Sequence, residues 1–200
     1  MSCGAFTEIQ FVMNELVPDD LHGKRILDVG SGFGFWGWIL RAHRQGNPHI
    51  TGIEINEERL QRCSEVGMYD QLLKIDVRDW LPLEEYDLII VSHIIEHLSK
   101  SEGKILINKM KVACKGMLIV TCPEGDTRSP LSENDPPDDE HISVWKKDDF
   151  MKMGMITRHM RFSHRSGRIV CLFERLWFWL KGLKRGGVLI GWWYHDESLP

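Results

Sequence analysis

The sequence lacks several features that mark particular classes of protein. Its five cysteines are odd in number and never spaced C-x-x-C, which argues against a disulfide framework or a zinc ribbon and favours a reducing compartment. No apolar run approaches the roughly 20 residues that a membrane-spanning helix needs, and the N-terminal MSCGAFTEIQ is unlike a secretory signal. A net charge of −4 supplies no basic excess for a general nucleic-acid coat. We therefore expect a cytoplasmic, globular chain of about one domain.

Charge is distributed unevenly along the chain. Residues 124–149 hold nine acidic residues against three basic ones, a net charge of −6, whereas residues 157–185 hold eight basic residues against one acidic residue, a net charge of +7. Within the acidic stretch, EGDTRSPLSENDPPDDE is rich in Pro, Asp, Glu and Ser, which disfavours a buried strand. We predict a loop there.

Short apolar runs alternate with segments of helical length through the first 120 residues, a pattern typical of βαβ units around a parallel sheet. The predicted strands span residues 25–29, 49–55, 72–75, 87–92 and 117–122. The predicted helices span residues 7–16, 35–44, 57–66 and 101–113. After the acidic loop we predict a short helix in HISVWKKDDFMKMG and a final hairpin that pairs residues 156–163 with residues 168–175. The pattern predicts an α/β fold.

The first predicted strand runs directly into a glycine-rich turn, Gly30-Ser31-Gly32-Phe33-Gly34, and a helix follows. Such a turn lets backbone N–H groups and a helix N-terminus approach a ligand closely. The turn therefore indicates a nucleotide-like cofactor, although a strand-to-helix turn that binds nothing could carry the same glycines.

Three acidic residues, Asp28, Glu54 and Asp76, stand at or near the ends of the first three predicted strands. The carboxylate of Glu54 could accept hydrogen bonds from a ribose diol, and that of Asp76 could accept one from an exocyclic adenine amine. Each residue alone could be a cap or a solvated loop residue. The three together favour a nucleotide site.

A set of segments in fixed order carries a resemblance to a known family. LDVGSGFG, GIEIN, KIDVRDWLP, YDLIIVSHIIEHL and KGMLIVTCPEG resemble the motifs of the class I S-adenosylmethionine (SAM)-dependent methyltransferases, and HISVWKKDDF is similar to a segment of small-molecule members of the type 11 group. The match covers residues 21–150. It implies SAM as the cofactor and a three-layer Rossmann-like fold, with a mostly parallel seven-stranded sheet that ends in an antiparallel hairpin.

The resemblance also implies roles for individual residues. Asp28, Gly30 and Gly32 would hold the methionine part of SAM, and Glu54 would bind the ribose. Asp76 and the Val77 backbone amide would bind the adenine, and Ile55 would pack on its face. We also expect Ser92, at the end of the fourth predicted strand, to bind the cofactor.

Two other interpretations stay open. Gly32-x-Gly34-x-x-Gly37 also satisfies the dinucleotide fingerprint, with Glu54 close to the expected position of the ribose-binding acid, so an NAD-dependent oxidoreductase is the rival enzyme. It ranks lower because Asp28 and Asp76 would have no role in it. A catalytically inactive protein of the same fold, acting as a partner subunit, is the other alternative.

Methyl transfer to an oxygen requires removal of a proton, for which histidine is the natural base near neutral pH. His93 directly follows the fourth predicted strand and His141 follows the acidic loop, so we predict that one of them assists proton removal from a small-molecule or lipid-like acceptor. Glu96 and His97 could join them in binding a metal ion. Glu96 and His97 are adjacent, however, so they would point to different faces of a helix, and we predict no metal.

The C-terminal segment LWFWLKGLKRGGVLIGWWYHD combines four tryptophans with basic residues. We predict a methyltransferase domain over residues 1–175 and an aromatic and basic tail over residues 176–200. Trp and basic residues suit peripheral contact with a membrane or a cover over an apolar acceptor, and packing on the sheet is the alternative. No dedicated nucleic-acid-binding module accompanies them.

Overall fold

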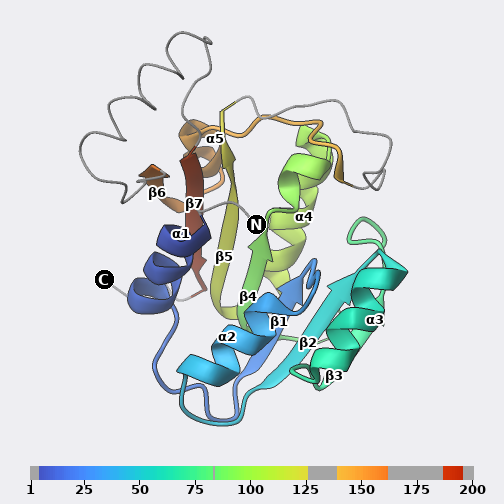
Figure 1. Cartoon of the computed structure of the whole chain (residues 1–200). Helices are drawn as coiled ribbons and strands as arrows, with labels where there is room; N and C mark the ends of the chain where they lie inside the picture. The colour runs from blue at the N-terminus through green and yellow to red at the C-terminus, as the bar shows by residue number, and fades with distance from the viewer. Residues whose placement is uncertain (1–4, 83, 126–138, 162–186, 196–200) are drawn as a thin grey trace, which may run out of the picture.

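A seven-stranded sheet with the strand order β3-β2-β1-β4-β5-β7-β6 forms the centre of the molecule (Figure 1). This computed structural model describes residues 5–82, 84–125, 139–161 and 187–195. The strands are β1 (Arg25–Val29), β2 (His49–Glu54), β3 (Gln71–Lys74), β4 (Tyr86–Ser92), β5 (Cys114–Glu124), β6 (Ile156–Arg161) and β7 (Gly187–Tyr194). The helices are α1 (Ala5–Phe11), α2 (Phe35–His43), α3 (Glu57–Val66), α4 (Lys100–Ala113) and α5 (Lys147–Lys152), with a π-helical turn η1 (Val12–Leu16) and a 3-10 turn η2 (Ile95–His97).

The first five strands run parallel, and β7 lies antiparallel between β5 and β6. This confirms the predicted α/β class with a mostly parallel sheet and antiparallel C-terminal strands. Strand β6 pairs with Gly187–Tyr194, and residues 168–175, the predicted second strand of the hairpin, lie outside the described residues. The prediction followed the nearest apolar run after a Ser-Gly turn, whereas β7 lies further along the chain and satisfies the backbone groups of β5 and β6 together.

The position of β7 also bears on the predicted tail. Strand β7 pairs with β5 from Gly187 to Tyr194, so this part of residues 176–200 belongs to the sheet. Two of the four tail tryptophans, Trp192 and Trp193, pack against the two cores of the molecule. Residues 176–186 lie outside the described residues, and membrane contact through them stays a prediction. No described helix is long and apolar enough to cross a bilayer.

Alternate residues of the strands supply two separate cores, one on each face of the sheet. Leu27 and Val29 of β1 join a core with α4 and α5, whereas Ile26 joins a core with α1, η1 and α2. The central strands are apolar on both faces because helices cover both, which explains why they read as continuous apolar runs in the sequence.

Two helices begin at side-chain caps that the sequence places just before them. Asn56 accepts a hydrogen bond from the Arg59 amide at the start of α3. Ser99 and Glu102 form a reciprocal capping box at the start of α4. Both caps follow strands at the carboxyl edge of the sheet, so they fix where the loops of that edge end.

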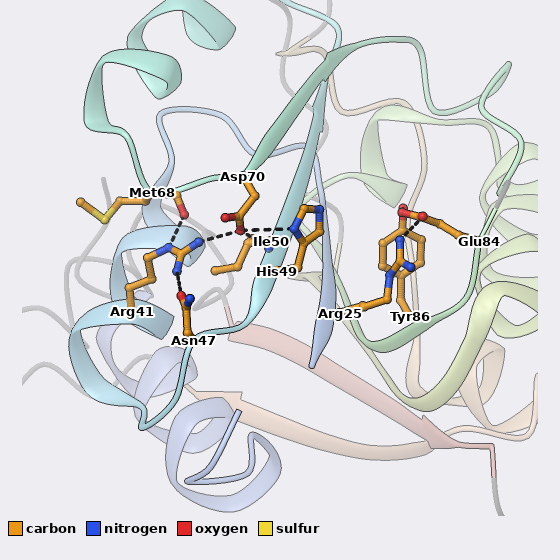
Figure 2. A network of polar contacts seen from close by, with 9 residues as sticks. All are labelled: Arg25, Arg41, Asn47, His49, Ile50, Met68, Asp70, Glu84 and Tyr86. Atoms are coloured by element: carbon orange, nitrogen blue, oxygen red, sulfur yellow. Dashed lines mark hydrogen bonds and ion pairs between the residues drawn. The ribbon is translucent and has the colours of Figure 1, made fainter. Parts of the chain in front are cut away.

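The amino edge of the sheet carries a network of ion pairs (Figure 2). Arg41 of α2 donates to the backbone oxygen of Met68 (2.7 Å), to the Asn47 side chain (3.2 Å) and to the Asp70 carboxylate (2.7 Å). Asp70 also accepts from the Ile50 amide at 2.7 Å. These contacts connect α2, β2 and the start of β3 at the edge opposite the glycine turn.

Candidate active site

The glycine turn after β1 adopts a backbone that requires glycine. Gly30, Gly32 and Gly34 have φ values of +75°, +53° and +85°, in the left-handed region that L side chains rarely adopt. A Cβ on Gly30 would lie 2.0 Å from Cδ1 of Ile94. The amides of Gly30 and Ser31 both donate to the Ile53 oxygen, at 2.8 and 3.0 Å, which holds the turn against β2.

Glu54 connects this turn to the end of β2. Its Oε2 accepts from the Gly32 amide and its Oε1 from the Asn56 amide, each at 2.9 Å, and the side chain is buried. A carboxylate oxygen has lone pairs for more than one donor. Glu54 can therefore fix the turn and still accept from a ligand hydroxyl.

Asp28 lies behind the turn, where its burial argues against the predicted contact with a ligand. It is fully buried, and its Oδ2 accepts a 2.5 Å hydrogen bond from the Tyr69 hydroxyl, which itself accepts from the Gly37 amide. Burial raises the pKa of Asp28 to about 7, with the Tyr69 hydrogen bond opposing the shift and the Glu54 charge adding to it. Asp28 is two residues after Ile26 in the same strand, so both side chains face the α2 side of the sheet. From that face Asp28 supports the glycine turn.

Asp76 follows β3 and forms an ion pair that the sequence reading did not include. The Arg78 guanidinium donates to both of its carboxylate oxygens, and the Arg78 amide donates to Oδ1 at 2.8 Å. These side-chain hydrogen bonds lower the pKa of Asp76, so the group is a carboxylate at neutral pH. Asp76 remains an acceptor for a ligand amine at the edge of the pocket.

His93 is held between two buried carboxylates. Its Nε2 lies 3.1 Å from Oε2 of Glu8 in α1, and its Nδ1 lies 3.2 Å from Oε1 of Glu96. Burial alone would lower the pKa of His93, but the two carboxylates raise it to about 10. With both ring nitrogens engaged and a proton on each at neutral pH, His93 is not placed to accept a proton from a substrate. This arrangement argues against the predicted role of His93 as a general base.

His93 also has a strained backbone, with φ at +55°, the sole positive value among the described non-glycine residues. Its amide donates to the Thr121 oxygen at 3.0 Å, and the neighbouring Ser92 hydroxyl lies 3.1 Å from that of Thr121. Strain of this kind persists where the surrounding structure holds it, and it is common at functional sites.

One pocket of about 290 Å³ opens along the carboxyl edge of the sheet. Eight of the ten predicted site residues line it: Gly30, Gly32, Glu54, Ile55, Asp76, Val77, Ser92 and His93. Ile94, Leu98 and Ile142 add apolar surface. His141 is not among the lining residues, but its ring packs edge-on against the lining residue His97 with the centroids 4.8 Å apart.

Comparison with known proteins indicates which family this part of the chain resembles. A family model described as a methyltransferase domain matches residues 26–116, the stretch from β1 to β5 that carries the glycine turn, Glu54 and Asp76. The match indicates a methyltransferase domain over these residues. No curated protein matches its sequence.

Solved structures similar to this chain show the same fold at low sequence identity. Coclaurine N-methyltransferase bound to N-methylheliamine and SAH is 14% identical, with a TM-score of 0.64 over 95% of this chain and 72% of that chain. The N-methyltransferase NodS from Bradyrhizobium japonicum WM9 is 11% identical, with a TM-score of 0.60 over 98% and 94%. A SAM-dependent methyltransferase from Mesorhizobium loti is 16% identical, with a TM-score of 0.58 over 89% and 93%.

Several residues of this site were not predicted from the sequence. Arg59 of α3 forms a 2.5 Å ion pair with Asp139 across the rim of the pocket. Tyr69 and Glu8 contact Asp28 and His93 from segments far away in the sequence, and no local pattern marks either one. The acidic run before His141 was the one available signal for Asp139.

Proposed function

We propose that this protein transfers the methyl group of SAM to an oxygen or nitrogen atom of a small-molecule or lipid-like acceptor. The observation that carries this proposal is the mixed lining of the pocket, which combines polar groups with apolar side chains. The glycine turn, Glu54 and Asp76 offer amides and carboxylates to a polar cofactor. Ile94 and Ile142 offer apolar surface to an acceptor beside it.

In this proposal seven of the lining residues have tasks in binding SAM. Gly30 and Gly32 carry no side chain, so the methionine part of SAM can approach their backbone closely. Glu54 accepts from the ribose hydroxyls. Asp76 and the Val77 amide bind the adenine. Ile55 packs on the adenine face, and Ser92 completes the cofactor end.

Methyl transfer is an in-line displacement at a sulfonium, so positioning of the acceptor supplies most of the catalysis. Acceptor oxygens also lose a proton. Since His93 is bonded on both ring nitrogens, we assign assistance in proton removal to His141, which packs on the pocket residue His97. The complex of coclaurine N-methyltransferase with N-methylheliamine supports the choice of a small organic acceptor.

The rival NAD-dependent oxidoreductase is disfavoured by the sheet. A dinucleotide-binding Rossmann sheet has the parallel order 3-2-1-4-5-6. Here antiparallel β7 lies between β5 and β6. Asp76 would also have no task in hydride transfer between a nicotinamide and a small substrate.

Calorimetry with SAM, its demethylated product and NAD tests the proposal. We expect binding of the first two in the micromolar range and no measurable binding of NAD. Glu54→Ala and Asp76→Ala should each weaken SAM binding by about 1–3 kcal/mol, the scale for hydrogen bonds to a charged group. Glu58→Ala is the matched control, because Glu58 is exposed on α3 and pairs with Arg62.

The opposite pattern would overturn the proposal. Tight NAD binding without a response to SAM would favour the oxidoreductase. SAM affinity that is equal in Glu58→Ala and Asp76→Ala would remove Asp76 from the site. Because Glu54 also holds the glycine turn, Glu54→Gln serves as a second variant that keeps an acceptor for the Gly32 amide.

A further inference from the structure

Three side chains with metal-ligating atoms converge beside the acceptor end of the pocket. Glu96 and His97 belong to η2, and His141 lies in the segment that precedes α5. One ligand atom from each of the three lies within 4.8 Å of the others. His97 lines the pocket itself, so the cluster borders the space proposed for the acceptor.

The two segments that carry these residues are joined by other groups. The backbone oxygen of Glu96 accepts from the amides of Ile142 and Ser143, at 2.9 and 3.1 Å. The Ile95 oxygen accepts from the Ser143 hydroxyl at 3.0 Å and from the Trp145 indole at 3.1 Å. Because these bonds hold the two segments together, the positions of the three side chains are fixed by the backbone around them.

The orientation of His97 is that of a metal ligand. Its Nδ1 lies 3.1 Å from the backbone oxygen of Glu140. A carbonyl oxygen can only accept, so this hydrogen bond places the proton on Nδ1 and leaves the Nε2 lone pair as a donor to a cation. Histidine ligands in metal sites commonly donate their other ring N–H to a carbonyl in this way.

Glu96 supplies an independent observation. The residue is 1% exposed, and its Oε1 lies 3.2 Å from Nδ1 of His93. Within the described part of the chain, its buried Oε2 has no hydrogen-bond partner. A buried carboxylate oxygen without a partner is costly, and a bound cation would remove that cost.

We propose that Glu96, His97 and His141 bind a divalent transition-metal ion. Two imidazoles and one carboxylate suit zinc, cobalt, manganese or iron(II) better than calcium or magnesium, which prefer oxygen ligands. Three protein ligands leave coordination positions open for a substrate. The sequence predicted no metal because adjacent residues diverge on a long helix, whereas Glu96 and His97 lie in a three-residue 3-10 turn.

A metal ion at this site would take part in the methyl transfer described above, so its role rests on the proposed function. An acceptor hydroxyl bound to the cation has a lowered pKa and loses its proton to solvent water. The resulting oxygen anion forms a bond to the methyl carbon. The carbon–sulfur bond breaks with its electron pair passing to sulfur, which leaves a neutral thioether. His141 then assists proton removal by holding the metal.

Metal titration of the chelator-treated full chain tests the site. We expect one equivalent of Co²⁺ to bind with the absorption bands of a nitrogen- and oxygen-ligated ion, and Zn²⁺ to displace it. His141→Gln and His97→Gln should each weaken binding at least tenfold. His22→Gln is the matched control, since His22 is exposed and far along the chain from η2. Each variant is first checked for a cooperative melt.

The outcomes separate this proposal from the proposed function. Absence of stoichiometric binding, or binding that is equal in His141→Gln and His22→Gln, would overturn the metal site. SAM calorimetry on the same samples reports on the cofactor independently. Normal SAM binding with no metal binding would refute the metal site alone, and metal binding without SAM binding would refute the proposed function.

Discussion

Carboxylates at the two edges of the sheet have different partners. At the amino edge, carboxylates meet cations: Asp70 pairs with Arg41 and Glu84 with Arg25 (Figure 2). At the carboxyl edge, by contrast, buried Asp28 accepts from a neutral hydroxyl and Glu54 from backbone amides. The comparison shows that cations hold the carboxylates of the amino edge, whereas neutral donors hold the two buried carboxylates beside the glycine turn.

The difference should appear first as opposite responses to pH. The unfolded chain releases the Asp28 proton near its ordinary pKa of 3.8, and the folded chain holds it to about 7. The unfolded state thus binds fewer protons between these values, so this group makes the free energy of unfolding fall as pH rises from about 4 to about 7. Asp28→Asn should remove this decline, worth a few kcal/mol at about 1.4 kcal/mol per pKa unit.

Urea denaturation of both proteins from pH 4 to pH 8 measures this effect. Asn keeps an acceptor for the Tyr69 hydroxyl and leaves the nearby Glu54 charge in place, so the comparison isolates the titration of Asp28. If the free energy of unfolding changed with pH in the same way in both proteins, the folded and unfolded chains would have the same Asp28 pKa. The proposed difference between the two edges would then be wrong.

The largest expected loss at the amino edge follows from Arg41→Ala. This change removes three hydrogen bonds and leaves Asp70 without its arginine, so the free energy of unfolding should fall by about 1–3 kcal/mol. SAM affinity should stay unchanged, because Arg41 lies at the far end of α2 from the glycine turn. Urea denaturation measures the loss of stability, and calorimetry measures the SAM affinity. Glu58→Ala is the surface control, and its free energy of unfolding should fall by only about 0.3–0.5 kcal/mol. A matching loss of SAM affinity would show that the edges are coupled.

A smaller effect is expected for Asp87→Asn, also at the amino edge. Partial burial would raise the pKa of Asp87, but hydrogen bonds from the Arg25 amide and from Lys24 lower it overall. Its stabilisation is therefore present above pH 4 and is lost as pH falls through the lowered pKa. The variant should be less stable by about 1 kcal/mol at pH 7. Thermal melts at pH 7 and pH 3 should show the gap closing at acid pH; a constant gap would contradict the assignment.

Much of the fold could be predicted from local pattern. The predicted bounds of the first strand and of the helix over residues 57–66 agree with β1 and α3. Strongly apolar runs, a capping Asn56 and a terminating Gly67 carry this information within a few residues. The second strand of the hairpin could not be found in this way, because its pairing with β5 and β6 depends on contacts across the chain.

The sequence by itself determined the order of the elements, the glycine turn and the carboxylates at the strand ends, because each of these features depends on a short stretch of neighbouring residues. Tertiary structure alone decided what those groups do. It buried Asp28 against Tyr69, placed His93 between Glu8 and Glu96, and brought His141 to His97. The protonation of a side chain depends on burial and on charges from distant segments, and these become fixed only when the strands and helices pack.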